Sequence, residues 1–598
     1  MPGRHAVRPL LLLASLGGGA PLAGQDAYWQ QDVRYTIEAT LDEGSGVLSG
    51  AAEVEYTNRS PQTLNELYFH QYLNAFRPGS RWAQVEQRAE YDFQHLQDPD
   101  YGFERVRSLT VGGRPVPPEY PGAPDSVVMR VPLATPLAPG QSVVVRIEWD
   151  GRLSTLCRRQ CRKGRHYDFA QWYPRIATYD RGGWQAHTLF PQGEFYGEFA
   201  DYDVTLEVAA DQVLGGTGVV VEGDPGWRPA AGSPSSEAPF QRDAYGEATP
   251  TRLGHLAATP TSDRKQVRFR AERVHHFAWT ANPEYRYEAG RWGDIAIHVL
   301  YQPGDEADWG AGVAVERTAR ALSFLNEVFG PYPWPQLTNV HRLEGGGTEF
   351  PMMIMDGDAG QGLILHESAH QYAHGVLANN EWREGWMDEG MASFITSWYA
   401  ERRGGADRGA VWNRLVDQVG ALPLSHAIDG RSEDFPDFRT YSLLTYTKPS
   451  AVLYMLREEL GEDVFLRGLR AYFARSALQH VTQADLRSAM EWVSGRELAW
   501  FFDQWINSAA TLDYAIANAS SESSAGGWRT TVQITRSGNA WMPLTVQVGG
   551  RQFQVSGREA AQTLTVETEE RPMRIELDPD RKILDTDRSN NVWQPSER

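Results

Sequence analysis

Four residues near the middle of the chain have the types and the spacing that bind a catalytic metal ion. His366, Glu367 and His370 lie in the run LHESAHQY, and Glu389 follows in WMDEG. On a helix of about 3.6 residues per turn, two histidines four positions apart project from the same face, so both imidazoles reach one ion. Glu367 lies between them and is free to hold a water molecule. The pattern predicts a zinc site with hydrolytic chemistry.

A catalytic zinc ion keeps three protein ligands and one open position, so a third ligand is needed. His374 continues the four-residue spacing, but it lies roughly 12 Å from His366 along a helix axis at about 1.5 Å per residue. Zinc–nitrogen bonds of about 2.0–2.1 Å cannot span that distance. We therefore expect His374 to be a packed or hydrogen-bonded helix residue. A metzincin would have its third histidine where this chain has Val376. Glu389 remains as the third ligand.

Two helices must position these residues. The first carries the histidine pair, and the second, WMDEGMASFITSWYAERR, returns Glu389 across it after a loop through Gly375 to Glu384. A strand, IAIHVLY, and a helical segment, AGVAVERTARALSFLNEVFG, precede the pair, and further helices follow as far as AWFFDQWINS. We expect a mainly helical catalytic domain over residues 284–510.

β-domains flank this helical region. Runs of alternating apolar and polar residues, broken by Gly and Pro, predict an N-terminal β domain over 25–283, with an irregular insertion at about 224–263. Strand patterns return after the helices and predict a small β-sandwich over 511–598. A chain of 598 residues has room for two to four domains. The predicted fold class is multidomain α+β.

The first 24 residues have the pattern of a secretory signal peptide. Arg4, His5 and Arg8 form a basic start, an apolar run covers 9–16, and small residues fill 17–24. The apolar run is too short to cross a membrane, and no later stretch approaches about 20 apolar residues. We expect an exported protein, periplasmic or secreted, without a transmembrane segment.

The charge and the cysteine content of the chain limit its possible binding partners and metal sites. The 57 basic and 77 acidic residues give a formal net charge of −20, which argues against nucleic acid as a partner. The two cysteines, Cys157 and Cys161, lie in CRRQCRKGRH. In an oxidising compartment a small-loop disulfide is natural; free thiols are the alternative, and a second metal site would need more ligands. We expect the basic run around them to be a solvated loop, with contact to an anionic substrate or envelope surface as the alternative.

The metal pattern also resembles a known family. His-Glu-x-x-His, followed after eighteen residues by a Glu-Gly pair on a tryptophan-bearing helix, resembles the M1 family of zinc aminopeptidases, which includes aminopeptidase N. The segment from Gly346 to Pro351 (GGTEFP) resembles the family's Gly-x-Met-Glu-Asn segment, and Tyr446 to Pro449 (YTKP) resembles its Tyr-x-Lys-Gly segment. The resemblance covers roughly residues 28–514. It implies one zinc ion, a saddle-like N-terminal β domain and a thermolysin-like catalytic domain of the gluzincin type. No long helical array follows, so the chain resembles a short form.

The resemblance also implies a role for each matched residue. Glu367 is the general base, and Tyr446 stabilises the oxyanion of the tetrahedral intermediate. Glu349 holds the free α-amino group of the substrate, while Gly346 and Gly347 leave room for its backbone. Thr348 and Phe350 replace the Met and Asn of the family segment, a change that bears on pocket shape and leaves the anchor in place.

A second anchor for the amino group normally comes from the N-terminal domain. Gln171 is the candidate in AQWYPRIATYD, with Tyr173 at the alternative position. Glu194 and Glu198, in PQGEFYGEF, are further possibilities and equally compatible with structural roles.

The expected function is zinc-dependent aminopeptidase activity on peptides or proteins with a free N-terminus. An endopeptidase of the same gluzincin type is the alternative, and Glu349 discriminates between the two. An inactive binding scaffold has no support, because all ligands and the base are present.

Overall fold

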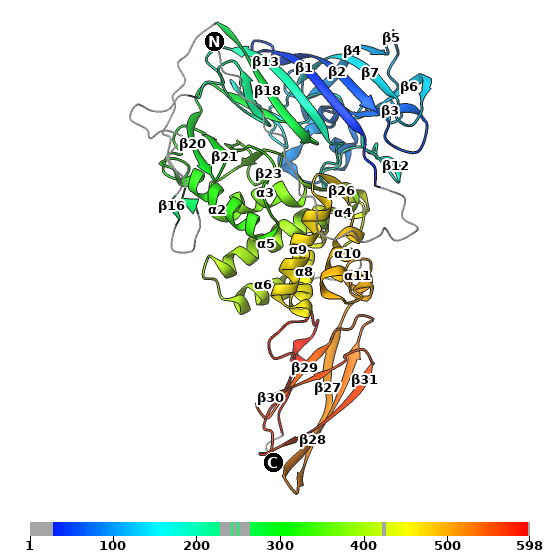
Figure 1. The fold of residues 1–598 in the computed structure, drawn as a ribbon, viewed down its shortest axis with the longest axis vertical. Helices are drawn as coiled ribbons and strands as arrows, with labels where there is room; N and C mark the ends of the chain where they lie inside the picture. Colours follow the sequence, from blue (N-terminus) through cyan, green and yellow to red (C-terminus); the bar gives the residue numbers. More distant parts are fainter. Residues whose placement is uncertain (1–27, 228–240, 243–247, 250–262, 421–425, 596–598) are drawn as a thin grey trace, which may run out of the picture.

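The computed structural model describes residues 28–227, 241–242, 248–249, 263–420 and 426–595. Three parts follow one another along the long axis of the molecule: strands, then helices, then strands again (Figure 1). The predicted multidomain α+β fold class is therefore confirmed. The predicted signal peptide and most of the predicted insertion at 224–263 lie outside the described residues.

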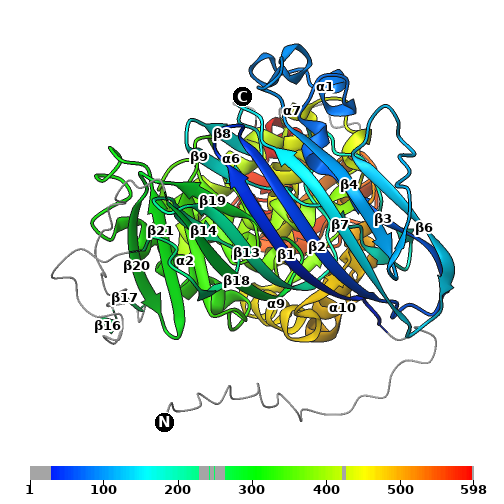
Figure 2. The same cartoon turned by 90° about the horizontal axis from the view of Figure 1, so that it is seen from above.

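The N-terminal part is built on an eight-stranded sheet whose strands alternate between buried and exposed residues. In β1 (Asp32–Asp42), every second side chain from Val33 to Leu41 is buried, so one face of the strand packs on the core. β1 pairs in parallel with β13 (Ala200–Ala209), and its other neighbour, β2 (Val47–Thr57), is antiparallel. Figure 2 shows these long strands lying across the helices. The sheet order is β15 (Val219–Glu222), β18 (Arg264–Val274), β13, β1, β2, β7 (Ser142–Arg152), β4 (Phe103–Val111), β5 (Arg114–Pro115).

Two smaller sheets lie beside the large one and lead towards the helices. The first contains β10 (Arg175–Ile176), β3 (Leu64–His70) and β6 (Val128–Leu137); the second contains β14 (Val213–Gly216), β19 (Trp279–Asn282), β9 (His166–Phe169) and β8 (Cys161–Lys163). Between β12 (Gly183–Trp184) and β13, residues 185–199 form no helix or strand, although most of them are buried. This segment contacts the loop before β8 through Glu194 and Arg159, and the charge of Glu194 acts on the predicted site residue Glu349.

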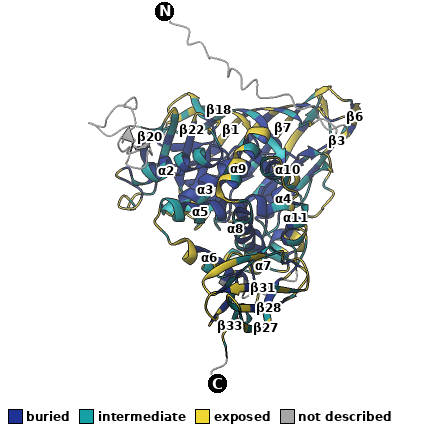
Figure 3. Ribbon diagram, turned by 60° about the horizontal axis from the view of Figure 1, so that its bottom comes forward, coloured by how far each residue is buried: buried dark blue, intermediate teal, exposed yellow. Residues whose placement is uncertain are grey.

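The middle part opens with a five-stranded sheet and continues as helices. The sheet order is β20 (Arg286–Trp292), β21 (Ile295–Tyr301), β22 (Gln336–His341), β24 (Met353–Asp356), β23 (Gly347–Thr348), so β23 is an edge strand. The longer helices are α2 (Val313–Val328), α3 (Gln361–Ala373), α5 (Glu389–Arg402), α6 (Arg408–Gly420), α8 (Lys448–Leu460), α9 (Glu462–Ser476), α10 (Gln483–Ser494) and α11 (Ala499–Trp505). In Figure 3, α3, α5 and α8 are mostly buried at the centre of this part.

The C-terminal part consists of two small sheets. One has the order β27 (Asp513–Ser524), β28 (Gly527–Ser537), β31 (Ala561–Thr568), and the other β30 (Arg551–Val555), β29 (Leu544–Val548), β32 (Ile575–Leu577), β33 (Val592–Trp593). One hydrophobic core runs through all three parts. Among the described residues, none of the helices combines the length and the apolar character needed to cross a membrane.

Candidate metal centre and active site

Helix α3 carries the histidine pair at the junction between the N-terminal sheets and the helices (Figure 1). The ring centroids of His366 and His370 are 4.7 Å apart, as expected for residues one helical turn apart. From Ile364 onwards nearly every residue of α3 is buried, so the helix is held from several sides. His374 lies one residue past the end of α3, as its C-cap.

The three predicted metal ligands converge. Glu389 is the first residue of α5, and its Oε2 lies 3.1 Å from Nε2 of His366 and 3.3 Å from Nε2 of His370. Ligand bonds of about 2.0–2.1 Å in a tetrahedral zinc site place ligand atoms about 3.3–3.4 Å apart. Glu389 thus lies at the ligand spacing of a zinc site from each of the two histidines. Although burial alone would raise it, the two histidines hold the pKa of Glu389 well below its usual range.

Asp388 fixes the orientation of His370. Its Oδ1 contacts Nδ1 of His370, and the Asp388 side chain is fully buried. An imidazole that donates its Nδ1–H to a carboxylate presents the Nε2 lone pair on the other side of the ring. His370 thus offers Nε2 towards Glu389 and His366.

Glu367 lies against the edge strand β23. A Cβ atom added to Gly347 would lie 2.0 Å from Cδ and Oε1 of Glu367, so the space beside this glycine is filled by the carboxylate. Because Gly347 has no side chain, the Glu367 carboxylate fits against it. The prediction gave this glycine a different role, which was to leave room for a substrate backbone. Oε2 of Glu367 has no hydrogen-bond partner within the described residues. Burial raises the pKa of Glu367 well above its usual range.

Glu349 follows β23 directly and is 4% exposed. Burial, followed by the negative charge of Glu194, raises the pKa of Glu349 to about 8. Glu194 is itself 2% exposed and forms an ion pair with Arg159, while its Oε2 has no partner within the described part of the chain. The site therefore holds two adjacent buried carboxyl groups and one buried guanidinium.

Tyr446 lies in a π-helical turn, η6 (Leu443–Thr447), between α7 (Phe438–Ser442) and α8. Its hydroxyl donates a hydrogen bond to Oε1 of Glu389, and its ring is parallel to that of His366 with 6.2 Å between centroids. Burial, then the charge of Glu389, raises the pKa of Tyr446 well above its usual value. The phenol therefore keeps its proton beside the metal ligands. The π turn matters because such irregular turns re-aim side chains at functional sites.

Cys157 and Cys161 form a disulfide, and the loop between them packs into the site. The backbone N–H of Arg159 donates to Oε2 of Glu344 at 2.8 Å, and Nη1 of Arg158 donates to Oε1 of Glu344 at 3.2 Å. Both arginines are 8% exposed, so the expectation of a solvated loop is wrong here. The two guanidinium groups can be buried because carboxylates on neighbouring segments pair with them.

The candidates for a second amine anchor are placed differently from one another. Gln171 is buried with a left-handed φ of 56°, its Nε2 lacks a partner among the described residues, and it makes no hydrogen bond to Glu349 there. Tyr173 donates to the Tyr202 hydroxyl at 2.9 Å within an aromatic cluster. Glu198 binds Nε2 of His480 at 2.8 Å, outside the metal site. Of the four candidates, Glu194 is the one whose charge acts on Glu349 and on Glu389.

Sequence reasoning missed Arg159, Asp388 and Glu381. Asp388 had a usable signal, because a carboxylate directly before a metal-binding glutamate can reach the second nitrogen of a ligand histidine. Arg159 and Glu381 had none, because their positions depend on how distant segments pack together.

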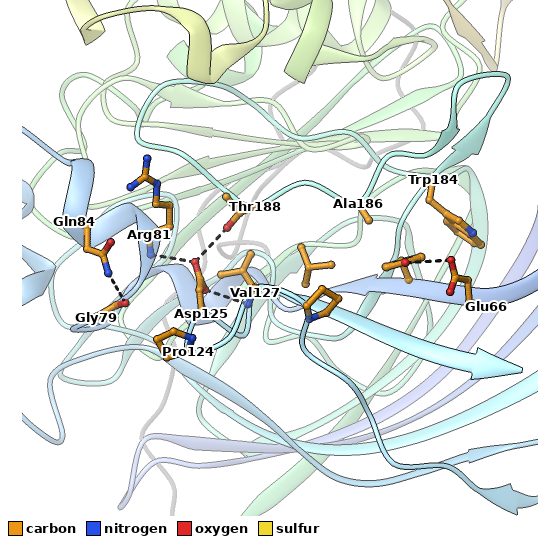
Figure 4. A pocket seen from close by; sticks show the side chains of 14 residues that line it. Glu66, Gly79, Arg81, Gln84, Pro124, Asp125, Val127, Trp184, Ala186 and Thr188 are labelled. Atoms are coloured by element: carbon orange, nitrogen blue, oxygen red, sulfur yellow. Dashed lines mark hydrogen bonds between the residues drawn. The ribbon is translucent and has the colours of Figure 1, made fainter.

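A separate cavity of about 710 Å³ lies in the N-terminal part (Figure 4). Glu66 and Trp184 line one end and Arg81, Gln84 and Asp125 the other. Asp125 accepts hydrogen bonds from the backbone N–H groups of Arg81 and Val127, at 3.0 and 3.2 Å. Asp125 thus hydrogen-bonds to the backbone around the cavity. None of the predicted site residues lines this cavity.

Comparisons with known proteins find peptidases similar to parts of this chain. Residues 313–505 match the model of the peptidase family M1 domain. Aminopeptidase N of Streptomyces lividans is 29% identical over 154 residues, which are 24% of this chain and 18% of that protein. Aminopeptidase 2, mitochondrial, of Saccharomyces cerevisiae is 26% identical over 250 residues, 37% of this chain and 26% of that protein. The chain thus matches about a quarter or less of the length of these two relatives.

Among solved structures, the M1 zinc metallopeptidase from Deinococcus radiodurans has the same fold over 80% of this chain and 94% of its own, with a TM-score of 0.55 at 18% identity. Residues 313–505 of the chain are therefore similar to the peptidase family M1 domain, and the chain resembles aminopeptidase N-like proteins in that region.

Proposed function

We propose that this protein is a zinc-dependent aminopeptidase that removes N-terminal residues from peptides or proteins with a free N-terminus. One observation supports the proposal: Oε2 of Glu389 lies at zinc-ligand spacing from Nε2 of both His366 and His370, beside the buried carboxylate of Glu367. The names of the matched relatives support it, although each covers only part of the chain.

The chemistry divides between the bound ion and the side chains around it. Zinc, when bound, supplies Lewis acidity that lowers the pKa of a coordinated water and polarises a carbonyl. Glu367 accepts the proton of the attacking water on its free Oε2 and later delivers a proton to the leaving amine. Tyr446 donates its phenolic proton to the oxyanion that forms at the scissile carbonyl.

Glu349 sets where the substrate begins. β23 is an edge strand, so an extended peptide can pair with it and present its first residue to Glu349. A substrate ammonium brings a positive charge next to Glu349, which favours the ionised carboxylate despite burial. A blocked amine supplies no such charge. An endopeptidase would have no need for a buried carboxylate at this point.

The Glu367→Gln variant tests the mechanism. We expect it to keep its zinc, since Glu367 is not a ligand, and to lose about 10²- to 10⁴-fold in kcat on aminoacyl-amide substrates. Glu198→Gln is the matched control, because Glu198 is equally buried but pairs with His480 away from the ligands. Full activity of Glu367→Gln would overturn the mechanism.

We further propose export, to a periplasm or outside the cell. The disulfide between Cys157 and Cys161 supports an oxidising compartment. Mass spectrometry of the mature protein would detect removal of the first 24 or so residues, as the signal pattern predicts; an intact N-terminus would contradict it.

A further inference from the structure

A group of buried polar side chains joins the ligand His370 to the N-terminal β domain. The group starts at Asp388, which holds Nδ1 of His370. Glu381 is the first residue of α4 (Glu381–Glu384), and an oxygen of its carboxyl group lies within 4.8 Å of a carboxyl oxygen of Asp388. The same carboxyl group also contacts Nδ1 of His374. The side chains of Glu381, Asp388 and His374 are each no more than 2% exposed.

Glu381 also reaches across the domain boundary. Its Oε2 accepts a hydrogen bond of 2.7 Å from the backbone N–H of Phe195, in the irregular segment 185–199. Phe195 follows Glu194, whose charge acts on Glu349. One carboxyl group thus contacts the residue that orients a metal ligand and the segment that brings Glu194 to the site.

The network continues from His374 into the N-terminal domain. Nε2 of His275 lies 3.2 Å from the carbonyl oxygen of His374, and Nδ1 of His275 lies 2.9 Å from Nδ1 of His276. Nε2 of His276 in turn contacts the guanidinium of Arg175. With both imidazoles neutral, one tautomer of each satisfies the whole series: Arg175 donates to His276, His276 to His275, and His275 to the carbonyl. These bonds use all four ring nitrogens of His275 and His276, which a metal ion bound between these residues and His374 would need.

We propose that Glu381 is a positioning residue, which holds Asp388, and through it the ligand His370, in place while it binds the N-terminal domain through Phe195. Two carboxyl groups that face each other in a buried space are stable when a proton lies between them. A protonated Glu381 can donate to Asp388 and still accept from Phe195. Burial raises the pKa of Glu381 well above its usual range, in agreement with this arrangement.

Three substitutions separate positioning from bulk stability. Glu381→Gln keeps a donor for Asp388 and an acceptor for Phe195, so zinc affinity should stay within about threefold of wild type. Glu381→Leu removes both, and loss of such an outer partner of a metal ligand typically costs about 10- to 100-fold in metal affinity. Glu381→Asp is one methylene shorter and cannot span both partners, so an intermediate loss is expected; this variant serves if Glu381→Leu does not fold.

The readouts are the zinc dissociation constant, from competition with a chelator, and amide hydrogen exchange. Exchange of the peptide containing Phe195 should accelerate in Glu381→Leu and Glu381→Asp and stay slow in Glu381→Gln. Glu104→Leu is the control for loss of a buried carboxyl group, because Glu104 is 4% exposed and lies in β4 of the N-terminal sheet. It should leave zinc affinity unchanged.

The inference rests on the proposed zinc site but not on the substrate. Wild-type protein that fails to bind zinc would refute the proposed function. If wild type binds zinc and the folded Leu and Asp variants bind it equally well, Glu381 has no positioning role. A Gln variant as weak as the Leu variant would also overturn the proposal.

Discussion

Replacing Gly347 by alanine should disable the general base without touching the metal ligands. The added Cβ would lie 2.0 Å from Cδ and Oε1 of Glu367 and 2.4 Å from its Cγ. Non-bonded carbon atoms approach to about 3.5–4.0 Å, so either the carboxylate or the strand must move by about 1.5 Å. A misplacement of about 1 Å can cost about 100-fold in rate, which is about 2.7 kcal/mol in the activation free energy.

The assay compares kcat on an aminoacyl fluorogenic amide with zinc content and thermal unfolding of the same sample. Zinc should stay bound, because the three atoms nearest to the added Cβ all belong to Glu367, which is not a predicted zinc ligand. Gly345→Ala is the matched control, since an added Cβ there meets nothing within 4 Å. A Gly347→Ala enzyme with kcat within threefold of wild type would refute the placement of Glu367 against β23.

Three further predictions concern the oxyanion, the disulfide and pH. Tyr446→Phe should lower kcat by about 100- to 1000-fold with little change in KM. A rise in KM with unchanged kcat would contradict the oxyanion role. Reduction, or Cys157→Ser with Cys161→Ser, should raise KM, because the loop that carries the arginines opens, while stability falls by at most about 2 kcal/mol for so short a loop; an unchanged KM would exclude support of the site by the loop. Burial lowers the pKa of His187 and of His275 to about 3, below the unfolded value of about 6.5, so the unfolded state takes up protons first. Each should therefore lower stability by about 1.4 kcal/mol from pH 7.5 to 5.5, measured by urea unfolding, and His187→Phe should make the fall smaller by about that amount; a pH-independent stability would contradict it.

The parts of the site that lie on regular helices could be predicted from the sequence. Residues four apart on a helix lie on the same face, so the spacing of His366 and His370 predicts that both point to one ion. A second helix was needed to bring Glu389 close to them. The structure differs in detail, because the second helix begins at Glu389 and not at Trp386, where a short 3₁₀ turn lies instead. His374 is packed and in contact with Glu381, as expected, but it caps α3 from outside.

The parts that depend on irregular segments could not be predicted. Arg159 reaches the site from a disulfide-closed loop with a left-handed φ of 62°, and Glu194 from a buried segment without strand or helix period. Neither sequence pattern indicates which way the side chain points. The basic run looked like a solvated loop because its partners, Glu344 and Glu194, are distant in the sequence.

The N-terminal candidates show the same limit. Gln171, Tyr173, Glu194 and Glu198 all stood at plausible positions, and only packing separates them. Glu198 pairs with His480 and Tyr173 donates to Tyr202, whereas Glu194 lies where its charge acts on Glu349.

The most direct test of the central claim compares kcat/KM for a free-amine aminoacyl amide and its N-acetylated form, in wild type and in Glu349→Gln. A buried carboxylate that pairs with the substrate ammonium should make wild type favour the free amine by at least about 100-fold, and the substitution should remove most of that preference by lowering only the free-amine rate. Equal cleavage of both substrates by wild type, or a preference that survives in Glu349→Gln, would contradict the aminopeptidase assignment.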